Sequence, residues 1–370
     1  MIVDADSHVL EPPDLWESRL DPQFRENGVR IVERDGVETL LIGGNVIMQG
    51  TLAGLGGVDV VPRTNLFTQQ MKYQDACPPA SYDAKARIAL YDEWGVDKGL
   101  VFPTIGILPF LTDDMPLLSA MMTAYNRWQA DFAEEADGRV VPIANLNLRD
   151  LDSAIRELDD CIERGFKGIF LPPEAIDGKL PGDPHFDPLW ARAAEAGVPL
   201  CFHVVVRFTG AARPFAGWLE AGAGMQFGFA LGGTGQLIPA IAHMALSGVF
   251  DRIPDLKVVS VEAGCGWAPY LMDRLDEKHH TIGTMNPAPT KHKPSDYLRT
   301  NVWYVAEPEE RTIGAVLDLV GEDRVLWGSD YPHIDSTLQA PNQIRTAVAD
   351  LSPARQAAVL GGNAQRVFGL

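Results

Sequence analysis

The sequence of 370 residues carries 31 basic and 50 acidic side chains, which gives a formal net charge of −19. Nucleic acids and anionic membranes are bound through basic faces, so this balance argues against both as partners. Nearly half of the residues are hydrophobic, which is typical of a packed globular protein. The length is compatible with one large domain, because (β/α)₈ barrels run from about 200 to more than 400 residues.

The cysteines and the apolar segments exclude further classes of protein. The four cysteines show no paired spacing, which argues against a disulfide framework and a structural zinc site. The N-terminal residues lack a basic region followed by an apolar stretch, so no secretory signal is expected. No apolar run approaches the roughly 18 residues of a membrane span. We therefore expect a cytoplasmic protein that does not bind membranes.

Short apolar runs alternate with helical patterns, beginning with a predicted strand at Ile2–Ala5. The other predicted strands are Lys98–Phe102, Val140–Leu146, Gly168–Leu171, Val198–Val206, Lys257–Val261, Val302–Val305 and Val325–Gly328. The predicted helices include Asp83–Trp94, Leu117–Ala136, Leu151–Arg164, Leu189–Ala196 and Arg311–Leu319. Continuous apolar strands that alternate with helices indicate a parallel sheet. Eight such units predict a single (β/α)₈ barrel over residues 1–370, and no glycine-rich dinucleotide turn follows the first strand.

Two segments interrupt this pattern. Residues 28–82 begin with an alternating hairpin around an Asp-Gly turn and continue as a stretch rich in Gly, Pro and Gln. Residues 207–235 follow the predicted fifth strand and carry several aromatic side chains. Insertions after barrel strands lie on the carboxyl face, where active sites are built, so both are interpreted as lids or interface arms. They also suggest a homodimer.

Acidic and imidazole side chains gather at predicted strand ends. Asp6 and His8 alternate along the first strand, His203 lies on the fifth, and Asp330 ends the eighth. Each has an alternative interpretation, since a histidine on a strand is often structural and an aspartate at a strand end often caps a helix. Because carboxylate and imidazole groups at the carboxyl face of a barrel converge on one point, the set predicts a site for one divalent metal ion.

Five segments, taken in order, resemble the amidohydrolase superfamily, in the branch related to aminocarboxymuconate-semialdehyde decarboxylase. They are VDADSHVLEPPDLW, YDAKARIALYDEWGVDKGLVFPT, GVFDRIPDLKVVSVEAGCGWAPYLMDRLDE, VLWGSDYPHIDS and GNAQRVFGL. The resemblance implies a metal-binding barrel in which His8, His203 and Asp330 match usual ligands. Asp6 stands where the family usually has histidine, and an added oxygen ligand makes Mn²⁺ or Fe²⁺ alternatives to Zn²⁺, the first choice.

Other residues are candidates for catalysis and for substrate binding. Glu262 occupies the place of a catalytic histidine of the family, and His333 follows Asp330 closely. Either of them, or Asp330 itself, could donate the proton in a decarboxylation, although Glu262 could instead be a buried structural carboxylate and His333 could cap a turn. Substrate binding is expected from three residues after the fifth strand, two of which could equally be surface charges: Arg207, Arg213 and Trp218.

Three hypotheses for function follow. The leading one is a non-oxidative decarboxylase of an aromatic or conjugated carboxylic acid, with a small carboxylate as its substrate. The absence of a nucleotide motif agrees with a reaction that needs no redox cofactor. The second is a hydrolase of an amide, ester, lactone or C–C bond, in which Asp330 takes a proton from a metal-bound water. The third is a catalytically silent barrel that binds a ligand.

Overall fold

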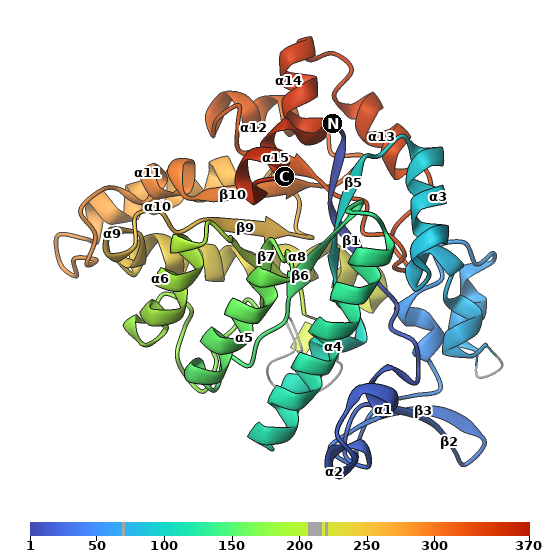
Figure 1. Ribbon diagram of the computed structural model, residues 1–370. Coiled ribbons are helices and arrows are strands. Elements are labelled where there is room, and N and C mark those ends of the chain that lie inside the picture. Colours follow the sequence, from blue (N-terminus) through green and yellow to red (C-terminus); the bar gives the residue numbers. More distant parts are fainter. Residues whose placement is uncertain (69–70, 206–216, 219–220) are drawn as a thin grey trace. The chain divides into compact units, whose positions relative to one another are not determined.

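The computed structural model describes residues 1–68, 71–205, 217–218 and 221–370 (Figure 1). The chain divides into two compact units. The first comprises Met1–Lys167 with Ser329–Asn342, and the second comprises Gly168–Gly328 with Gln343–Leu370. Eight parallel strands have the sheet order β1-β5-β6-β7-β8-β9-β10-β11. They are β1 (Val3–His8), β5 (Lys98–Phe102), β6 (Val140–Ala144), β7 (Gly168–Leu171), β8 (Leu200–His203), β9 (Val258–Val261), β10 (Val302–Ala306) and β11 (Val325–Trp327).

Each predicted strand is present; half of the strand ends match the prediction, and the others differ from it by one to three residues. The apolar runs become strands with almost every side chain buried, as expected for a parallel sheet covered on both faces. The first strand continues beyond Ala5 to His8, so the polar residues DSH are part of the strand itself. The backbone N–H of His8 donates to the carbonyl oxygen of Tyr331, which follows β11, at 2.6 Å.

The helices of the first unit begin at aspartate caps. They include α3 (Ala84–Trp94), α4 (Met115–Glu135) and α5 (Leu151–Glu163), along with the short α1 (Leu15–Arg19) and α2 (Pro22–Arg25). The carboxylates of Asp83, Asp114 and Asp150 each accept a backbone N–H of the first helical turn. Helix α3 ends at Gly95, whose φ of 62° is the left-handed conformation of a helix C-terminus.

A small antiparallel sheet lies within the segment predicted as the first insertion. The predicted hairpin is formed by β2 (Arg30–Arg34) and β3 (Val37–Ile42), and its turn residues Asp35 and Gly36 both have positive φ. A third strand, β4 (Asn45–Gln49), pairs with β3 and was not predicted. Its side chains are exposed or half-buried, so it lacks the apolar alternation that marks a strand against a core.

The second unit holds β7 to β11 and most of the remaining helices. These are α6 (Asp187–Glu195), α8 (Gly224–Leu246), α9 (Val249–Arg252), α10 (Ala268–Thr281), α11 (Pro294–Thr300), α12 (Ile313–Leu319), α14 (Pro353–Ala357) and α15 (Asn363–Phe368). Helix α13 (Ala340–Ala347) contains the boundary between the two units. The parallel pairs β8–β9 and β9–β10 run through this unit.

Helix α8 bears on two expectations from the sequence. It takes in residues 224–235, so the latter part of the predicted insertion 207–235 is helical. Among the described residues, α8 is also one helix that is long and apolar enough to cross a membrane, judged by length and composition alone. The sequence analysis had found no apolar run of that size. The run was missed because its glycines, Thr234 and Gln236 interrupt the large apolar side chains while adding no charge. About a quarter of this stretch (28%) is buried.

Candidate metal and catalytic site

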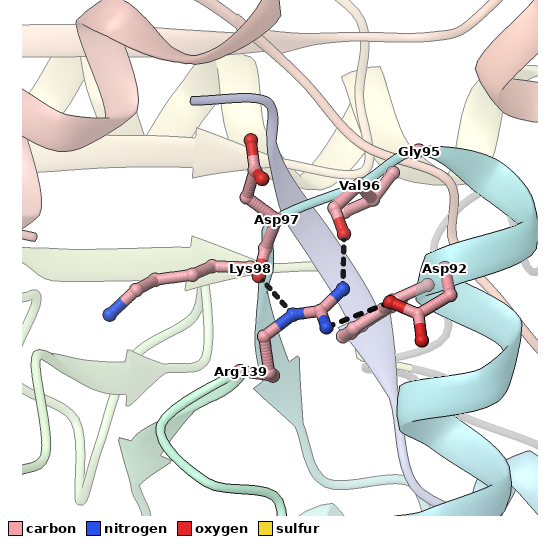
Figure 2. A pocket seen from close by; sticks show the side chains of 7 residues that line it. Asp92, Gly95, Val96, Asp97, Lys98 and Arg139 are labelled. Carbon is pink, nitrogen blue, oxygen red and sulfur yellow. Dashed lines mark hydrogen bonds and ion pairs between the residues drawn. The ribbon is translucent and has the colours of Figure 1, made fainter.

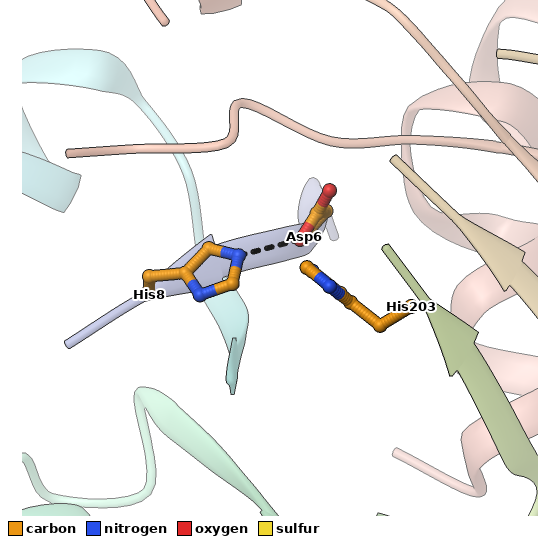
Figure 3. Close-up of side chains that lie close together, drawn as sticks. All are labelled: Asp6, His8 and His203. Atoms are coloured by element: carbon orange, nitrogen blue, oxygen red, sulfur yellow. Dashed lines mark ion pairs between the residues drawn. The ribbon is translucent and has the colours of Figure 1, made fainter. Parts of the chain in front are cut away.

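His8, at the carboxyl end of β1, has two carboxylates beside one ring nitrogen. Its Nδ1 lies 3.0 Å from Pro103 O, a carbonyl that can only accept, so Nδ1 carries the proton and Nε2 is the acceptor. The Nε2 atom is 3.4 Å from Asp6 Oδ1 and 3.4 Å from Asp330 Oδ1. Figure 3 shows Asp6 and His8 together on β1, with His203 of β8 also drawn. Three electron-rich atoms therefore converge in a buried place.

Asp330 is held in an unusual backbone conformation directly after β11. Its φ is 52°, the left-handed region that non-glycine residues seldom adopt. Its backbone N–H donates to Asp6 O at 2.8 Å, and the backbone N–H of His333 donates to Asp330 O at 3.0 Å. These bonds hold the turn against β1. Backbone strain of this kind costs about 1–3 kcal/mol and tends to occur at functional sites.

His333 contacts Asp330 on one side of its ring and Thr104 on the other. Its Nδ1 is 2.8 Å from Asp330 Oδ1, and its Nε2 is 2.9 Å from Thr104 Oγ1. The ring centroid lies 4.0 Å from that of His8. Burial lowers the pKa of His333 below its usual value, while nearby carboxylates, including Asp335 and Asp6, act in the opposite direction. His333 therefore contacts Asp330 directly, and its role as a proton donor or substrate anchor stays a prediction.

A second carboxylate of β1, Asp4, positions the turn that carries Asp330. Asp4 accepts the Ser329 hydroxyl at 2.6 Å and the Ser329 backbone N–H at 2.9 Å. Complete burial raises the pKa of Asp4 to about 7, although the Ser329 hydroxyl lowers it in part. Asp4 therefore ties β1 to the residue before Asp330 and does not join the carboxylates around His8.

The loop after β5 is held by Glu11, another buried carboxylate. It accepts backbone N–H groups from three consecutive residues at 2.8–3.0 Å: Thr104, Ile105 and Gly106. Burial raises the pKa of Glu11, and these backbone donors lower it in part. The loop carries Thr104, whose hydroxyl contacts His333. Glu11 thus fixes the backbone behind that contact.

In the second unit, His203 ends β8, and Glu262 directly follows the neighbouring strand β9. His203 Nδ1 lies 2.9 Å from Val204 O and 3.4 Å from Glu262 Oε2. Both neighbours of Nδ1 are acceptors when Glu262 is ionised, so the proton is on Nδ1 and Nε2 is the ligand-type nitrogen. Glu262 has a φ of 56°, so it shares the left-handed conformation of Asp330. This pairing gives Glu262 a role in orienting His203.

The donor set fits a divalent transition metal. In the first unit, His8, Asp330 and His333 each offer a ligand atom, and these atoms lie within 4.8 Å of one another. A buried nitrogen lone pair facing two carboxylate oxygens is unfavourable without a cation between them. The Pro103 carbonyl orients His8 as backbone carbonyls orient metal-binding histidines in other proteins.

The predicted substrate-binding residues are only partly described. Arg207 and Arg213 lie outside the described residues. Trp218 is 65% exposed, and its ring is stacked on Phe227 with centroids 5.8 Å apart. Trp218 and Phe227 therefore place two aromatic rings together in this segment. Contact of Trp218 with a substrate stays a prediction.

A surface hollow in the first unit lies away from these residues, at the amino end of β5 (Figure 2). Its volume is about 470 Å³, and Arg139 lies across it. The guanidinium donates to Asp97 O, Val96 O and the Asp92 carboxylate at 2.6–2.9 Å. Because these protein acceptors engage the guanidinium, the hollow is a packing feature and not a second active site.

Sequence reasoning assigned no role to Asp4, Glu11 and Thr104. The alternation of Asp4 with Asp6 was visible in the sequence, but its hydrogen bonds to Ser329 join residues 325 positions apart. Thr104 and His333 are separated by 229 positions. The PT dipeptide at the end of a strand gives no sign of such a partner.

Comparison with known proteins identifies the family. Residues 86–370 match the family model described as Amidohydrolase. The chain is 27% identical over 242 residues to a 2-amino-3-carboxymuconate-6-semialdehyde decarboxylase of Dictyostelium discoideum, which covers 65% of this chain and 64% of the relative. The matched part thus spans less than two thirds of the length of the curated relatives.

Solved structures agree in fold. An amidohydrolase from Mycobacterium avium subsp. paratuberculosis is 26% identical, with a TM-score of 0.80, and the match covers 100% of this chain and 99% of that one. A manganese-bound 5-carboxyvanillate decarboxylase mutant from Novosphingobium aromaticivorans is 21% identical, with a TM-score of 0.73 and 100% and 97% coverage. These matches confirm the predicted (β/α)₈ barrel. The chain belongs to the amidohydrolase family.

Proposed function

We propose that this protein is a metal-dependent decarboxylase of an aromatic or conjugated carboxylic acid. The main observation in favour of a metal site is that His8 Nε2 lies beside carboxylate oxygens of Asp6 and Asp330. This arrangement gathers three possible metal ligands in a buried place. The decarboxylase named among the relatives supports the reaction class. The hydrolase uses the same ligands, but nothing in the described geometry favours it.

The proposed ligands are Asp6, His8, His203 and Asp330. His203 joins the set because it ends β8 and its Nδ1 contacts leave Nε2 as the ligand-type nitrogen. Two carboxylates beside two imidazoles make a harder site than an all-histidine set, so Mn²⁺ competes with Zn²⁺ for it. The manganese bound in the 5-carboxyvanillate decarboxylase from Novosphingobium aromaticivorans supports Mn²⁺ as an alternative to Zn²⁺. When bound, the ion would draw electron density from a substrate oxygen beside the carboxylate.

The residues of the chain supply the proton. In a non-oxidative decarboxylation, an acid adds a proton to the ring or chain carbon and the bond from that carbon to the carboxylate breaks. The electron pair of that bond returns to the conjugated system as carbon dioxide leaves. We assign the proton to the contact between Asp330 Oδ1 and His333 Nδ1, 2.8 Å apart. Solvent restores it after each turnover, and Glu262 orients His203.

Substrate contacts are proposed for the segment after β8. The exposed ring of Trp218 offers a flat apolar face to an aromatic acid. Arg207 and Arg213 carry the charge that a carboxylate would pair with in a bidentate contact. A cytoplasmic location and a homodimer stay predictions beside this function.

The experiment combines metal analysis with carbon dioxide release. The protein purified after growth in Zn²⁺ or Mn²⁺ is expected to hold about one ion per chain and to release carbon dioxide from one or more dihydroxybenzoates or carboxyvanillates. His203→Ala and Asp330→Ala are expected to lose both metal and activity. His280→Ala, at an exposed position of α10, is the matched control and is expected to keep both.

Two outcomes would contradict the proposal in different ways. A protein that holds no metal under either growth condition would remove the basis of both enzyme hypotheses and favour the silent barrel. Retained metal without carbon dioxide release, but with turnover of esters or lactones, would favour the hydrolase.

A further inference from the structure

Strand β1 contains a bulge between Asp4 and Ser7. In its pairing with β5, Asp4 lies opposite Gly99. Ser7 lies opposite Val101, so two residues of β1 face a single residue of β5. Because side chains alternate along each strand, this register puts Asp4 and Ser7 on one face of β1 and His8 on the other. A regular strand would put Asp4 and His8 on the same face. Bulges are rare between parallel strands and often lie beside active sites, where they redirect a side chain.

The backbone of Asp6, inside the bulge, is held by several hydrogen bonds. Its N–H donates to Asp4 Oδ1 at 3.2 Å. Its carbonyl accepts two backbone N–H groups, from Ser329 at 3.0 Å and from Asp330 at 2.8 Å. The bulge thus joins β1 to the turn that carries Asp330.

The carbonyl of His8 takes its donor from a side chain and not from the sheet. In a parallel pair, the N–H and the C=O of one residue bond to the same neighbouring strand. The N–H of His8 donates to Tyr331 O, so the regular donor to His8 O would be the N–H of His333. That N–H donates to Asp330 O instead. Arg87 Nη2 donates to His8 O at 2.5 Å and supplies the hydrogen bond that the sheet does not.

Arg87, on α3, is a fully buried cation. Its contacts within the described part of the chain are carbonyls, hydroxyls and aromatic rings, and none of them is a carboxylate. Nε donates to Ala80 O at 2.5 Å, and Nη1 lies 3.3 Å from Ser7 Oγ and 3.2 Å from Tyr91 Oη. Cζ lies 5.6 Å from the ring centroid of Tyr91 and 5.1 Å from that of Tyr331. Because burial of an unpaired charge is costly, this set of acceptors and rings fixes where the guanidinium can lie.

Ser7 joins the guanidinium to β5. Its hydroxyl has one proton, and Leu100 O, 2.8 Å away, is a carbonyl that can only accept it. Ser7 Oγ is then the acceptor for Arg87 Nη1. The chain of hydrogen bonds therefore runs from Arg87 through Ser7 to the residue of β5 that lies opposite the bulge.

We propose that Arg87 and Ser7 are positioning residues that hold the bulge of β1 and thereby bring the side chains of Asp6 and His8 to one metal site. The inference rests on the proposed function for the metal, but not for the structure of the bulge. The guanidinium bonds Ala80 O and His8 O at the same time, so it fixes the end of β1 against the turn before α3. A lysine ammonium keeps the charge but lacks this rigid fork of donors.

Hydrogen exchange of the metal-free protein tests the bulge itself. In Arg87→Lys, the amide of His8 and the amides of Ser329 and Asp330, which donate to Asp6 O, are expected to exchange about tenfold faster or more. Amides of α5 serve as the internal reference and keep their rates. Mass spectrometry of peptic fragments measures both.

Metal affinity gives the second readout. Calorimetric titration of the metal-free protein with Mn²⁺ is expected to show a Kd about 10- to 100-fold higher in Arg87→Lys, the range for residues that orient metal ligands. Ser7→Ala is expected to raise the Kd in the same direction, and this smaller change keeps the inference testable if Arg87→Lys folds poorly. Arg87→Met separates geometry from charge. Loss of a nearby cation alone would lower the Kd for Mn²⁺, whereas loss of positioning raises it.

The matched control is Arg324→Lys in the second unit. The Arg324 guanidinium lies 4.3 Å from the ring centroid of Trp303 and donates to Thr300 O at 2.9 Å, so it has the same kinds of partner as Arg87. This variant is expected to lower the stability of the protein without changing the Kd or the exchange of the His8 amide.

The two readouts separate failure of the inference from failure of the proposed function. Unchanged exchange at His8 in Arg87→Lys overturns the inference whatever the metal does. Faster exchange with an unchanged Kd, or a lowered Kd in Arg87→Met, also overturns it, because Arg87 would then act through stability or charge alone. A raised Kd with faster exchange, in a protein that releases no carbon dioxide, supports the positioning role and rejects the decarboxylase.

Discussion

Hydrogen-bond partners assign distinct roles to polar residues that look alike in the sequence. Asp4 and Asp6 alternate on one strand, yet Asp4 accepts from Ser329 while Asp6 lies beside His8 Nε2. The Pro103 carbonyl decides which nitrogen of His8 accepts, because a carbonyl oxygen can only accept the proton of the ring. The residue type therefore limits which hydrogen bonds a side chain can make, and the neighbouring acceptors decide which of its atoms is left to bind a metal ion.

The replacement of the usual first histidine by Asp6 leads to a prediction about metal choice. Asp6→His exchanges an oxygen ligand for an imidazole nitrogen, which softens the site and favours Zn²⁺ over Mn²⁺. We expect the ratio of bound zinc to bound manganese to rise about tenfold or more, a change of roughly 1.4 kcal/mol in relative affinity. Metal analysis after dialysis against equal concentrations of both ions measures the ratio.

The control for this substitution adds an imidazole elsewhere. Asp113 is 96% exposed in side-chain terms, so Asp113→His introduces a surface histidine without touching β1. Its metal ratio is expected to equal that of the wild type. If Asp6→His left the ratio unchanged, Asp6 would not be a direct ligand.

At the scale of elements, the sequence predicted the eight strands well because buried parallel strands read as continuous apolar runs. It missed β4, whose side chains are largely exposed, and the first turns of α8, whose glycines hide a helical pattern. Asp6, His8 and Asp330 could be predicted as strand-end residues. The contacts of Thr104 could not be predicted, because its hydroxyl lies beside Val9 O, 95 positions away, and His333 Nε2, 229 positions away.

The packing of α10 against α11 predicts a pH-dependent contribution to stability. Asp276 on α10 accepts the Ser295 hydroxyl at 2.7 Å and the Ser295 backbone N–H, near the start of α11, at 2.9 Å. Burial raises the pKa of Asp276, but the Ser295 donors and Lys293 outweigh it, so the pKa is lowered from its ordinary value. A carboxylate with a lowered folded-state pKa stabilises the fold above the unfolded-state pKa, and this contribution is lost as pH falls through the folded-state value.

Asp276→Asn is therefore expected to lower the free energy of unfolding by about 1 kcal/mol at neutral pH, a small value because the contact is partly exposed. The difference from the wild type should stay constant above about pH 5 and shrink as the pH falls below about 4. Urea titrations at a series of pH values measure it. Asp273→Asn, at an exposed position of the same helix, is the control. A difference that persisted unchanged at pH 2 would contradict the ionic origin.

At the scale of the whole molecule, the net charge of −19 complicates any measurement of metal binding. Mutual repulsion among acidic groups destabilises a compact chain, so divalent cations in general relieve part of it by screening. A specific ion adds a separate contribution, because a ligand that binds only the folded state stabilises it by an amount set by its concentration and Kd. Only the contribution of the specific ion depends on the ligand residues, whereas screening by divalent cations does not.

Removal of the ion with a chelator is expected to lower the apparent Tm, and Mn²⁺ or Zn²⁺ to restore it. At 100 times Kd, a specific ion contributes about 2.7 kcal/mol, which corresponds to roughly 4 °C for a chain of this size. Mg²⁺ at the same concentration reports the screening alone, since it binds such mixed nitrogen and oxygen sites weakly. In Asp330→Asn the response to Mn²⁺ should fall to that of Mg²⁺. Equal responses to both ions in the wild type would attribute the effect to the acidic surface and not to a metal site.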